Sequence, residues 1–425
     1  MNTQEKYKAY VNTAFVKAVE PVVVDRAKGS TYTDEKGNTF IDCFSGISVA
    51  NAGHGNPMII EAAKAQMDKL VHCCSYVYHV AAVADLAEKL ARITPGRLKK
   101  SFFGNGGAEA IEGAIRLARR FSGKFEAVAL TQSFHGRSYA TLSLTGNAGR
   151  KMGGGPYMPG VAFAPAPNCY RCPFKLYNSE TCDMACAQYL DEVIRCHTSQ
   201  NVAFFIAEPV MGEGGIIAPP DNYFKVIKEI CDQHGVLFIA DEVQSGFCRT
   251  GKMFAIEHYS IEPDIMVMAK GIADGFPLSC FIARDEVADA FQVGDHLSTF
   301  GGNPVSCAAS LANIQFMETE NLAAQTLEKG TRLRQALAQI KPKDVVIGDI
   351  RGKGLMVGME LVEDEKTKAP AAAQAGMIRA RLREKGILVG VGGGLGNVLR
   401  IQPPLTISEA ELGQVVDGIK AVMTE

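Results

Sequence analysis

The feature that most constrains the fold of this chain is the alternation of short apolar segments with longer helical ones. Four predicted strands are apolar on both faces: Ala127–Leu130, Val202–Ala207, Val236–Ala240 and Ile265–Met268. Amphipathic segments such as Ala108–Arg120 and Asn222–His234 predict helices that accompany them. This pattern is typical of βαβ units, in which helices cover both faces of a parallel sheet. We therefore predict an α/β fold with ligands at the carboxyl ends of the strands.

The pattern changes near Asn303, where a second unit is predicted. Its predicted elements are helices Asn303–Glu318 and Leu322–Ile340, strand pieces within Val345–Val362, a helix at Ala371–Lys385, a strand at Val398–Gln402 and a helix from Ser408. The segment Gly29–Cys43, with a turn at Asp34–Gly37, is predicted to be a hairpin that joins this unit. We therefore divide the chain into residues 1–50 (N-terminal part of a small domain), 51–310 (large domain) and 311–425 (C-terminal part of the small domain).

Charge and composition exclude several classes of partner. The 425 residues carry a formal net charge of −2, and no basic stretch suggests nucleic acid or an anionic membrane. The N-terminus lacks the basic start and apolar run of a signal peptide, and no window approaches the ~18 apolar residues of a membrane span. We expect a cytoplasmic protein whose 12 cysteines are mostly reduced thiols.

Two predicted strands end in residues with complementary chemistry. The strand that starts at Val236 runs into Asp241, and the strand that starts at Ile265 is followed by Lys270. A buried structural ion pair is one explanation, since such pairs are common. The other is pyridoxal 5′-phosphate, which needs a lysine to form a Schiff base and a carboxylate to keep its pyridine nitrogen protonated. The same lysine would then move the substrate proton.

Two further segments fit a phosphate-bearing ring. In Phe102–Ala110 a short apolar stretch and a glycine turn precede a helix, whose N-terminus can bind phosphate, although a tight strand–helix connection explains the glycines equally well. The run Gly392–Gly396 does not fit such a template. In Ser133–Ser138 an aromatic side chain can stack on a ring and Arg137 can bind a carboxylate. Taken alone, His135 and Phe134 are also compatible with purely structural roles.

These residues resemble the class III, or ω-, aminotransferases of fold type I, and most of all their 4-aminobutyrate aminotransferase-like members. The resemblance spans nearly the whole chain and rests on four segments in the family's order: Asp241–Gly251, Met268–Gly271, Ser298–Pro304 and Asn397–Pro404. It implies a large domain with a mostly parallel sheet and a smaller α+β domain built from both termini. It also implies a homodimer or a dimer of dimers.

The resemblance assigns cofactor-binding roles to nine residues: Gly107, Ala108, Phe134, His135, Glu208, Asp241, Gln244, Lys270 and Thr299. It implies that Gly107 and Ala108 bind the phosphate through backbone N–H groups, and that Thr299 reaches the phosphate from the neighbouring subunit. Phe134 would stack on the ring and Gln244 would approach its phenolic oxygen. Many relatives have Ser or Thr in place of Ala108 and Tyr in place of Phe134.

The resemblance also assigns substrate binding, to Ile47, Arg137, Glu213 and Arg400. In related branches the residue matching Glu213 covers the arginine matching Arg400 while an ω-amino donor is bound, and then moves away so that this arginine can take an α-carboxylate. Arg137 would hold the distal carboxylate. A switchable pair of this kind avoids an unpaired buried charge. The alternative is a permanent structural pair.

An insert departs from the simplest relatives because it holds four cysteines: Cys169, Cys172, Cys182 and Cys186. A structural metal ion, a disulfide and free thiols are all compatible with the spacing, and we assign no metal site. Comparable inserts occur in relatives that use pyruvate or glyoxylate.

The predicted reaction is ping-pong transamination from an ω-amino acid, 4-aminobutyrate or a close homologue, to 2-oxoglutarate or pyruvate through a Lys270 Schiff base. The alternatives on the same scaffold are an amino-acid racemase or epimerase and an acetylornithine/ornithine- or alanine–glyoxylate-type aminotransferase. A binding or structural protein without turnover is a further alternative.

Overall fold

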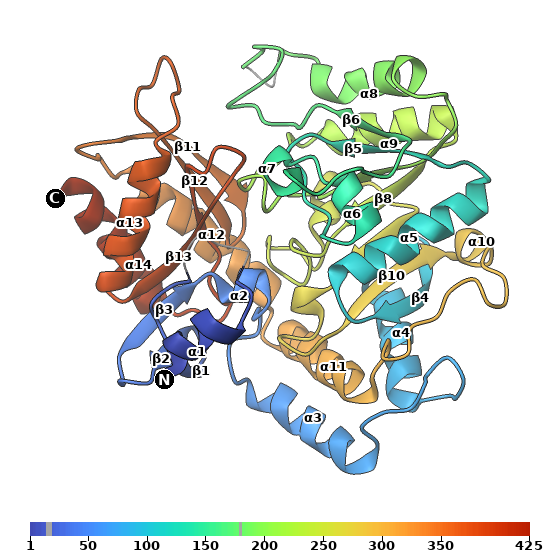
Figure 1. Cartoon of the computed structure of the whole chain (residues 1–425), viewed down its shortest axis with the longest axis horizontal. Helices are drawn as coiled ribbons and strands as arrows, with labels where there is room; N and C mark the ends of the chain where they lie inside the picture. The colour runs from blue at the N-terminus through green and yellow to red at the C-terminus, as the bar shows by residue number, and fades with distance from the viewer. Residues whose placement is uncertain (14–18, 178–180) are drawn as a thin grey trace.

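The computed structural model describes residues 1–13, 19–177 and 181–425. Within these ranges the strands form two sheets of seven strands each, and the two sheets lie in separate lobes (Figure 1). None of the helices in the described ranges is long and apolar enough to cross a membrane.

The larger lobe is built on a mostly parallel sheet with the order β4-β10-β9-β8-β7-β5-β6. Its strands are β4 (Leu98–Gly104), β5 (Glu126–Leu130), β6 (Val161–Ala164), β7 (Val202–Ala207), β8 (Leu237–Asp241), β9 (Ile265–Met268) and β10 (Ser279–Arg284). The four predicted strands are confirmed as β5, β7, β8 and β9, each within one residue at either end. These four and β6 run parallel.

The prediction of a mostly parallel sheet is confirmed, and the exception is β10, which is antiparallel to both β4 and β9. A parallel neighbour needs a crossover of a dozen or more residues, usually with an α-helix. The connection 269–278 between β9 and β10 contains only the short 3₁₀ helix η2 (Lys270–Ile272). The chain therefore returns in the opposite direction.

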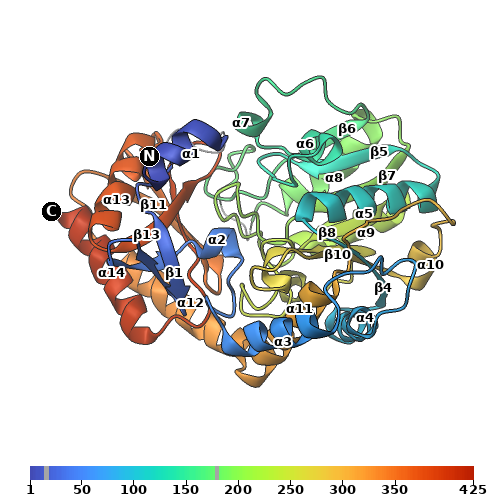
Figure 2. The same ribbon diagram turned by 60° about the horizontal axis from the view of Figure 1, so that its bottom comes forward.

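Helices cover both faces of this sheet (Figure 2). The helices of this lobe are α3 (Pro57–Lys69), α4 (Ala81–Ile93), α5 (Gly107–Ser122), α6 (Tyr139–Leu144), α7 (Ala148–Lys151), α8 (Ala185–Cys196), α9 (Tyr223–His234), α10 (Asp285–Ala288) and α11 (Pro304–Thr319), with the 3₁₀ helix η1 (Ala255–Tyr259). Neighbouring residues of one strand serve opposite faces, because side chains alternate along a strand. Phe204 belongs to the buried cluster that includes α5, whereas Phe205 packs with α8 and α9 in the other.

The smaller lobe joins both ends of the chain in one mixed sheet, with the order β1-β2-β3-β13-β14-β12-β11. Its strands are β1 (Val24–Lys28), β2 (Thr31–Asp34), β3 (Thr39–Cys43), β11 (Val346–Lys353), β12 (Met356–Val362), β13 (Ile387–Gly392) and β14 (Val398–Ile401). Its helices are α1 (Thr3–Tyr10), α2 (Ser45–Ser48), α12 (Leu322–Ala338), α13 (Ala372–Glu384) and α14 (Glu409–Thr424). The predicted hairpin is confirmed as β2–β3, and β3 joins the C-terminal strands by parallel pairing with β13.

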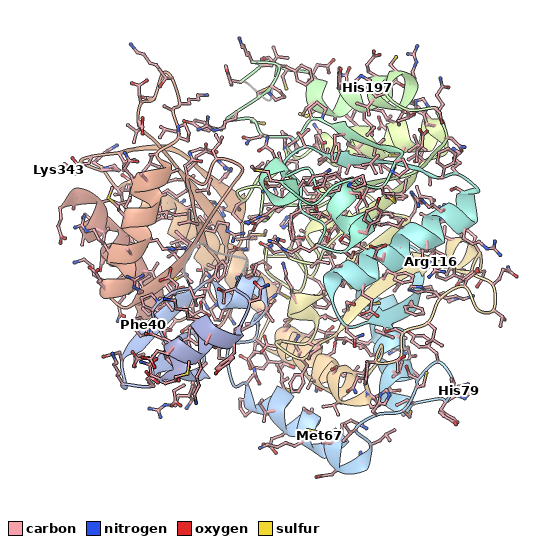
Figure 3. All side chains as sticks on the ribbon, viewed as in Figure 1. Phe40, Met67, His79, Arg116, His197 and Lys343 are labelled. Atoms are coloured by element: carbon pink, nitrogen blue, oxygen red, sulfur yellow. The ribbon has the colours of Figure 1, made fainter. Side chains whose placement is uncertain are left out.

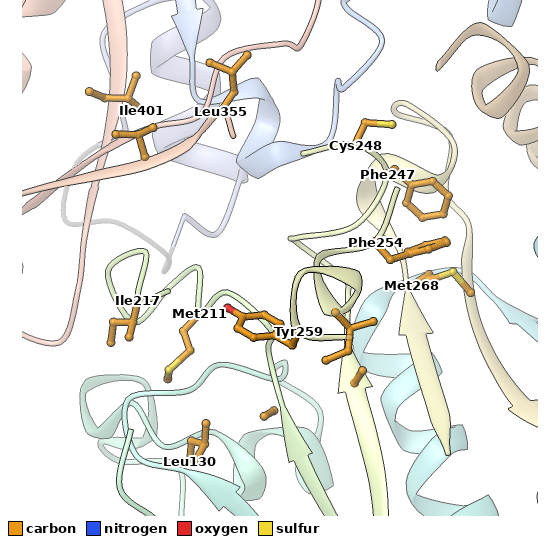
Figure 4. Packing of buried hydrophobic residues seen from close by; sticks show 14 of the residues in the cluster. Leu130, Met211, Ile217, Phe247, Cys248, Phe254, Tyr259, Met268, Leu355 and Ile401 are labelled. Carbon is orange, nitrogen blue, oxygen red and sulfur yellow. The ribbon is translucent and has the colours of Figure 1, made fainter. Parts of the chain in front are cut away.

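The two lobes share one continuous hydrophobic core. The largest buried cluster contains Leu130 and Met268 from the larger sheet together with Leu355 and Ile401 from the smaller lobe (Figure 4). Packed interiors transmit displacement because they contain few voids. Residues that reach the junction from either lobe are therefore held at defined distances from each other, and the candidate site lies there.

Candidate active site

A cavity of about 360 Å³ opens at the carboxyl ends of the parallel strands. Four of its wall residues follow or end neighbouring strands: Phe134 after β5, Glu208 after β7, Asp241 at the end of β8 and Lys270 after β9. Open α/β sheets bind ligands at this edge. The structure thus brings together the residues that the sequence placed at separate strand ends.

Asp241 is buried at the floor of the cavity and is fixed on both carboxylate oxygens. Nδ1 of His135 lies 2.7 Å from Oδ2 of Asp241, and the backbone N–H of Val243 donates to Oδ1 at 3.0 Å. Both side chains of the His–Asp pair are almost completely excluded from solvent. His135 therefore acts on the cavity through Asp241, which it holds in one orientation.

Lys270 lies opposite this acid, at the start of η2. Its backbone is in the left-handed region, with φ +50°, which is unfavourable for a residue with a β-carbon and is typical of functional sites. Burial lowers the pKa of the Lys270 amine below its ordinary value, although Asp241 and Glu208 oppose that shift. A lowered pKa increases the share of neutral amine, the form that attacks a carbonyl.

The N-terminus of α5 forms another wall through Gly107 and Ala108. The helix begins at Gly107 without a side-chain cap, so the first N–H groups of a 16-residue helix are available to a bound anion. A β-carbon at position 107 would lie 3.0 Å from Cγ1 of Val243. Glycine therefore lets the backbone approach the cavity. These donors fit a phosphate group, and the neighbouring Lys270 and Asp241 fit the aldehyde and the pyridine nitrogen of pyridoxal phosphate.

Glu208 holds the segment on the opposite side of the cavity. Its carboxylate accepts the backbone N–H of Phe134 at 3.0 Å and that of Gly212 at 2.8 Å. Burial raises the pKa of the Glu208 carboxyl. The pair of hydrogen bonds places the Phe134 ring at the cavity wall and joins the loop after β5 to the loop after β7.

Gln244 is linked to the smaller lobe through Gln402, a residue that the sequence reasoning missed. Nε2 of Gln402 donates to Oε1 of Gln244 at 3.0 Å and to the hydroxyl of Ser48 at 2.6 Å. Ser48 follows Ile47, and both have positive φ values, 60° and 72°. The signal for Gln402 was its place two residues after Arg400 in the predicted strand Val398–Gln402, because such residues share a face, although β14 itself ends at Ile401.

Glu213 lies buried between two arginines. Its Oε2 accepts a hydrogen bond from Nη1 of Arg400 at 2.9 Å, and its Oε1 pairs with Arg150. Burial raises the pKa of Glu213, but Arg400 and Arg150 outweigh it, so that the pKa lies below its ordinary value. Nothing in the sequence pointed to Arg150, which follows a glycine in a segment without strand or helix periodicity.

The guanidinium group of Arg400 has a hydrogen-bond donor that is not used by Glu213. Its side chain is only 2% exposed, and its Nε atom is buried without a hydrogen-bond partner among the described residues. A buried guanidinium donor without an acceptor is costly, and this Nε atom of Arg400 can therefore still bind an acceptor. The charges of Arg400 and Glu213 both act on Lys270, so the pair lies near the Lys270 amine.

Five predicted site residues lie outside the residues that line the cavity: Ile47, Arg137, Glu213, Thr299 and Arg400. Arg137 is exposed, with its guanidinium carbon 5.6 Å from the centre of the Phe134 ring. Thr299 is exposed on the surface of this single chain. Ile47 also stands outside, two residues before Val49, which does line the cavity.

The four-cysteine insert forms a small separate pocket. Cys169, Cys172, Cys182 and Cys186 all line it, and no disulfide joins them in the described part of the chain. Burial raises the pKa of the Cys186 thiol to about 12. Outside residues 14–18 and 178–180, no group of three or more His, Cys, Asp or Glu side chains is arranged to hold a metal ion.

A lysine amine, a fixed carboxylate and an uncapped helix N-terminus converge on one cavity of this fold, and together they define an aminotransferase-type pyridoxal-phosphate enzyme. The chain belongs to the class-III aminotransferase family, whose profile matches residues 14–423. Pyridoxal phosphate is the cofactor of that family.

Known proteins are similar over nearly the whole chain. The leucine/methionine racemase of Thermococcus litoralis is 37% identical over 423 residues, which cover 99% of this chain and 95% of that protein. A probable 4-aminobutyrate aminotransferase of Bacillus subtilis is 37% identical over 398 residues, covering 93% and 91%. The structure of an amine transaminase from an uncultivated Pseudomonas species in its PLP-bound form matches with a TM-score of 0.89 at 32% identity, covering 96% and 97%.

Proposed function

We propose that this enzyme transfers the amino group of an ω-amino acid, 4-aminobutyrate or a close homologue, to a keto acid with an α-carboxylate, 2-oxoglutarate or pyruvate. The observation that carries the proposal is the buried pair of Glu213 and Arg400, in which Arg400 keeps an unpartnered Nε donor. It rests on the family as well, since a 4-aminobutyrate aminotransferase is among the relatives.

The pair suits two substrates that differ in one carboxylate. While the donor is bound, no α-carboxylate is present, and Glu213 neutralises Arg400. When the keto acid binds, its α-carboxylate replaces Glu213 on Arg400. A permanently exposed Arg400 would instead leave a buried charge unpaired beside the donor, which is strongly unfavourable. We assign the carboxylate of the ω-amino donor and the distal carboxylate of 2-oxoglutarate to Arg137, whose planar guanidinium binds carboxylates through two parallel hydrogen bonds. We assign contact with the substrate chain to Ile47.

The cofactor-holding roles follow from the cavity walls. The backbone N–H groups of Gly107 and Ala108 would bind the phosphate, and Phe134 would cover one face of the ring. Gln244 would donate to the phenolic oxygen. Glu208 would position Phe134, to whose backbone it is hydrogen bonded.

Proton handling falls to two residues. When bound, the cofactor supplies an electron sink for the electron pair released from the substrate C–H bond. Lys270 removes the proton from the amine-bearing carbon of the donor and delivers a proton during the return half-reaction. Asp241 holds a proton at the pyridine nitrogen, and His135 keeps the Asp241 carboxylate oriented.

We further propose that the active unit is a homodimer in which Thr299 contributes to the neighbouring site. Thr299 is flanked by exposed apolar side chains, Leu297 at 60% and Phe300 at 61% exposure. The chain near Phe300 lies against the segment 71–78, which exposes Val71, Val77 and Tyr78. Exposed apolar surface of this kind is typical of protein–protein interfaces. Figure 3 labels two residues close in sequence to this segment, Met67 and His79, at the edge of the molecule.

A second candidate function is amino-acid racemisation, favoured by the similarity to a leucine/methionine racemase. Racemisation returns the proton to the carbon from which it came, so Lys270 and Asp241 would have the same roles in both reactions. Racemisation does not require Arg400 to change its partner from Glu213 to a substrate carboxylate. The behaviour of Glu213 therefore discriminates the two functions.

Replacing Glu213 by glutamine is expected to slow the donor half-reaction selectively. The kcat/KM for 4-aminobutyrate should fall about 10- to 100-fold, since the charge of Arg400 is then uncovered beside a donor without an α-carboxylate. The half-reaction with 2-oxoglutarate should change by less than about threefold, because its α-carboxylate itself neutralises Arg400. Single-turnover absorbance changes of the bound cofactor measure both values separately.

Glu360→Gln is the matched control, because Glu360 is also a buried glutamate shared by two arginines, Arg171 and Arg351. The charge of Glu213 acts on Lys270, whereas the charges that act on Glu360 are those of Arg351 and Arg171. An equal loss in both half-reactions of the Glu213→Gln enzyme would mean that Glu213 and Arg400 are a permanent structural pair.

A further inference from the structure

Glu213 has two cationic partners of different character. The side chain of Arg400 is 2% exposed, whereas that of Arg150 is 28% exposed. Arg400 comes from β14 in the smaller lobe, and Arg150 from the short helix α7 in the larger one. Each arginine pairs with a different oxygen of the Glu213 carboxylate. The bond to one arginine can therefore break while the other remains.

The second arginine lowers the energetic cost of replacing Glu213 by a substrate carboxylate on Arg400. The Glu213 side chain is only 9% exposed, and a buried carboxylate that loses its only cation is strongly destabilised. With Arg150 in place, Glu213 keeps a charge-assisted hydrogen bond after it leaves Arg400. Arg150 is also the more exposed of the two arginines.

We propose that Arg150 is the positioning residue that holds Glu213 while Arg400 binds the α-carboxylate of the acceptor. The inference rests on the proposed function and deepens it, since Arg150 then sets the affinity for acceptors with two carboxylates. While the donor is bound, Glu213 has two cationic partners, and removing Arg150 leaves it with Arg400. Once the acceptor has taken Arg400, removing Arg150 leaves Glu213 with no cationic partner. Acceptor binding is therefore weakened more than donor binding.

The test compares two unreactive ligands on the cofactor-loaded protein by titration calorimetry. Glutarate has the two terminal carboxylates of 2-oxoglutarate and needs Arg400, whereas valerate has a single carboxylate and does not. Arg150→Gln is expected to weaken glutarate binding about 10-fold or more, the effect of losing one charge-assisted hydrogen bond, and to change valerate binding by less than about twofold. Arg150→Lys keeps a cation at this position and should restore most of the glutarate affinity.

Two controls make the outcome specific to Glu213. Lys151→Gln removes the neighbouring charge on α7, which contacts Ser143 and not Glu213, and should leave both affinities unchanged. In a Glu213→Gln background, Arg150→Gln should no longer affect glutarate binding by more than about threefold, since the two residues act as one pair.

The remaining results overturn the inference in distinguishable ways. Equal affinities of the unmodified enzyme for glutarate and valerate would contradict the proposed function itself, because Arg400 would then not bind a second carboxylate. A preference for glutarate that persists unchanged in Arg150→Gln would leave the proposed function intact and refute the role of Arg150. Loss of glutarate binding that is just as large in the Glu213→Gln background would show that Arg150 contacts the ligand directly.

Discussion

Replacing Lys270 by alanine is expected to lower kcat/KM for transamination by at least about 10⁴-fold. General acid–base catalysis alone contributes ~10²–10⁴-fold, and the variant also loses the amine that joins the cofactor covalently. The purified variant should lack the visible absorbance of a lysine-linked cofactor, and borohydride reduction followed by mass spectrometry should find no cofactor attached to the chain.

Lys252→Ala is the control for this experiment, because Lys252 is exposed and lies outside the residues that line the cavity. It should retain normal activity and the normal spectrum. A Lys270→Ala protein that still carried a reducible covalent link to the cofactor would show that another lysine is the attachment site.

Replacing Asp241 by asparagine is expected to reduce kcat by about 10²–10³-fold, the usual effect of removing one preorganised electrostatic group from an active site. Asparagine preserves the shape of the side chain but cannot hold a proton at the pyridine nitrogen through a negative charge. The fall should appear in both half-reactions, since both release a C–H electron pair into the cofactor ring. Stopped-flow absorbance measures each half-reaction.

The neighbouring acid provides a matched control. Glu242 is buried and bonds to Ser245 and to the backbone of Ile256, and burial raises its pKa to about 7. Glu242→Gln therefore removes an acid that is already partly neutral and lies outside the residues that line the cavity. Its kcat should stay within about threefold of the original, because a substitution that does not reach the cavity leaves the groups that act on the substrate in place. An Asp241→Asn enzyme with equally high kcat would contradict the proposed role of Asp241.

The parts of the fold that could be predicted were those with a clear periodicity. The central strands β7 and β9 are apolar on both faces and were located to the residue. Strand β10 (Ser279–Arg284) was not among the predicted strands, and its antiparallel direction depends on the short connection from β9, about which strand periodicity carries no information. The parallel pairing of β3 with β13 brings together segments more than 300 residues apart, and the sequence indicated only that such a contact was plausible.

The site residues that could be placed from the sequence are those that directly follow a strand. Asp241 and Lys270 are placed by the ends of β8 and β9, so the rule for parallel sheets brings them together. Arg150 reaches Glu213 from a segment without periodicity, and only the folded chain reveals the contact. The roles of Ile47, Arg137, Glu213, Thr299 and Arg400 rest on the family resemblance and stay predictions, since these five residues lie outside those that line the cavity of a single chain.

The most direct test of the central claim is a half-reaction of the cofactor-loaded protein with 4-aminobutyrate, run beside L-leucine and L-methionine. We predict that 4-aminobutyrate causes a stable loss of the visible absorbance of the bound cofactor, that 2-oxoglutarate restores it, and that glutamate accumulates in equal amount. L-Leucine and L-methionine should keep their configuration on chiral chromatography. If 4-aminobutyrate and its homologues leave the absorbance unchanged while the two α-amino acids lose their optical purity, the enzyme is a racemase and the proposed transamination is wrong.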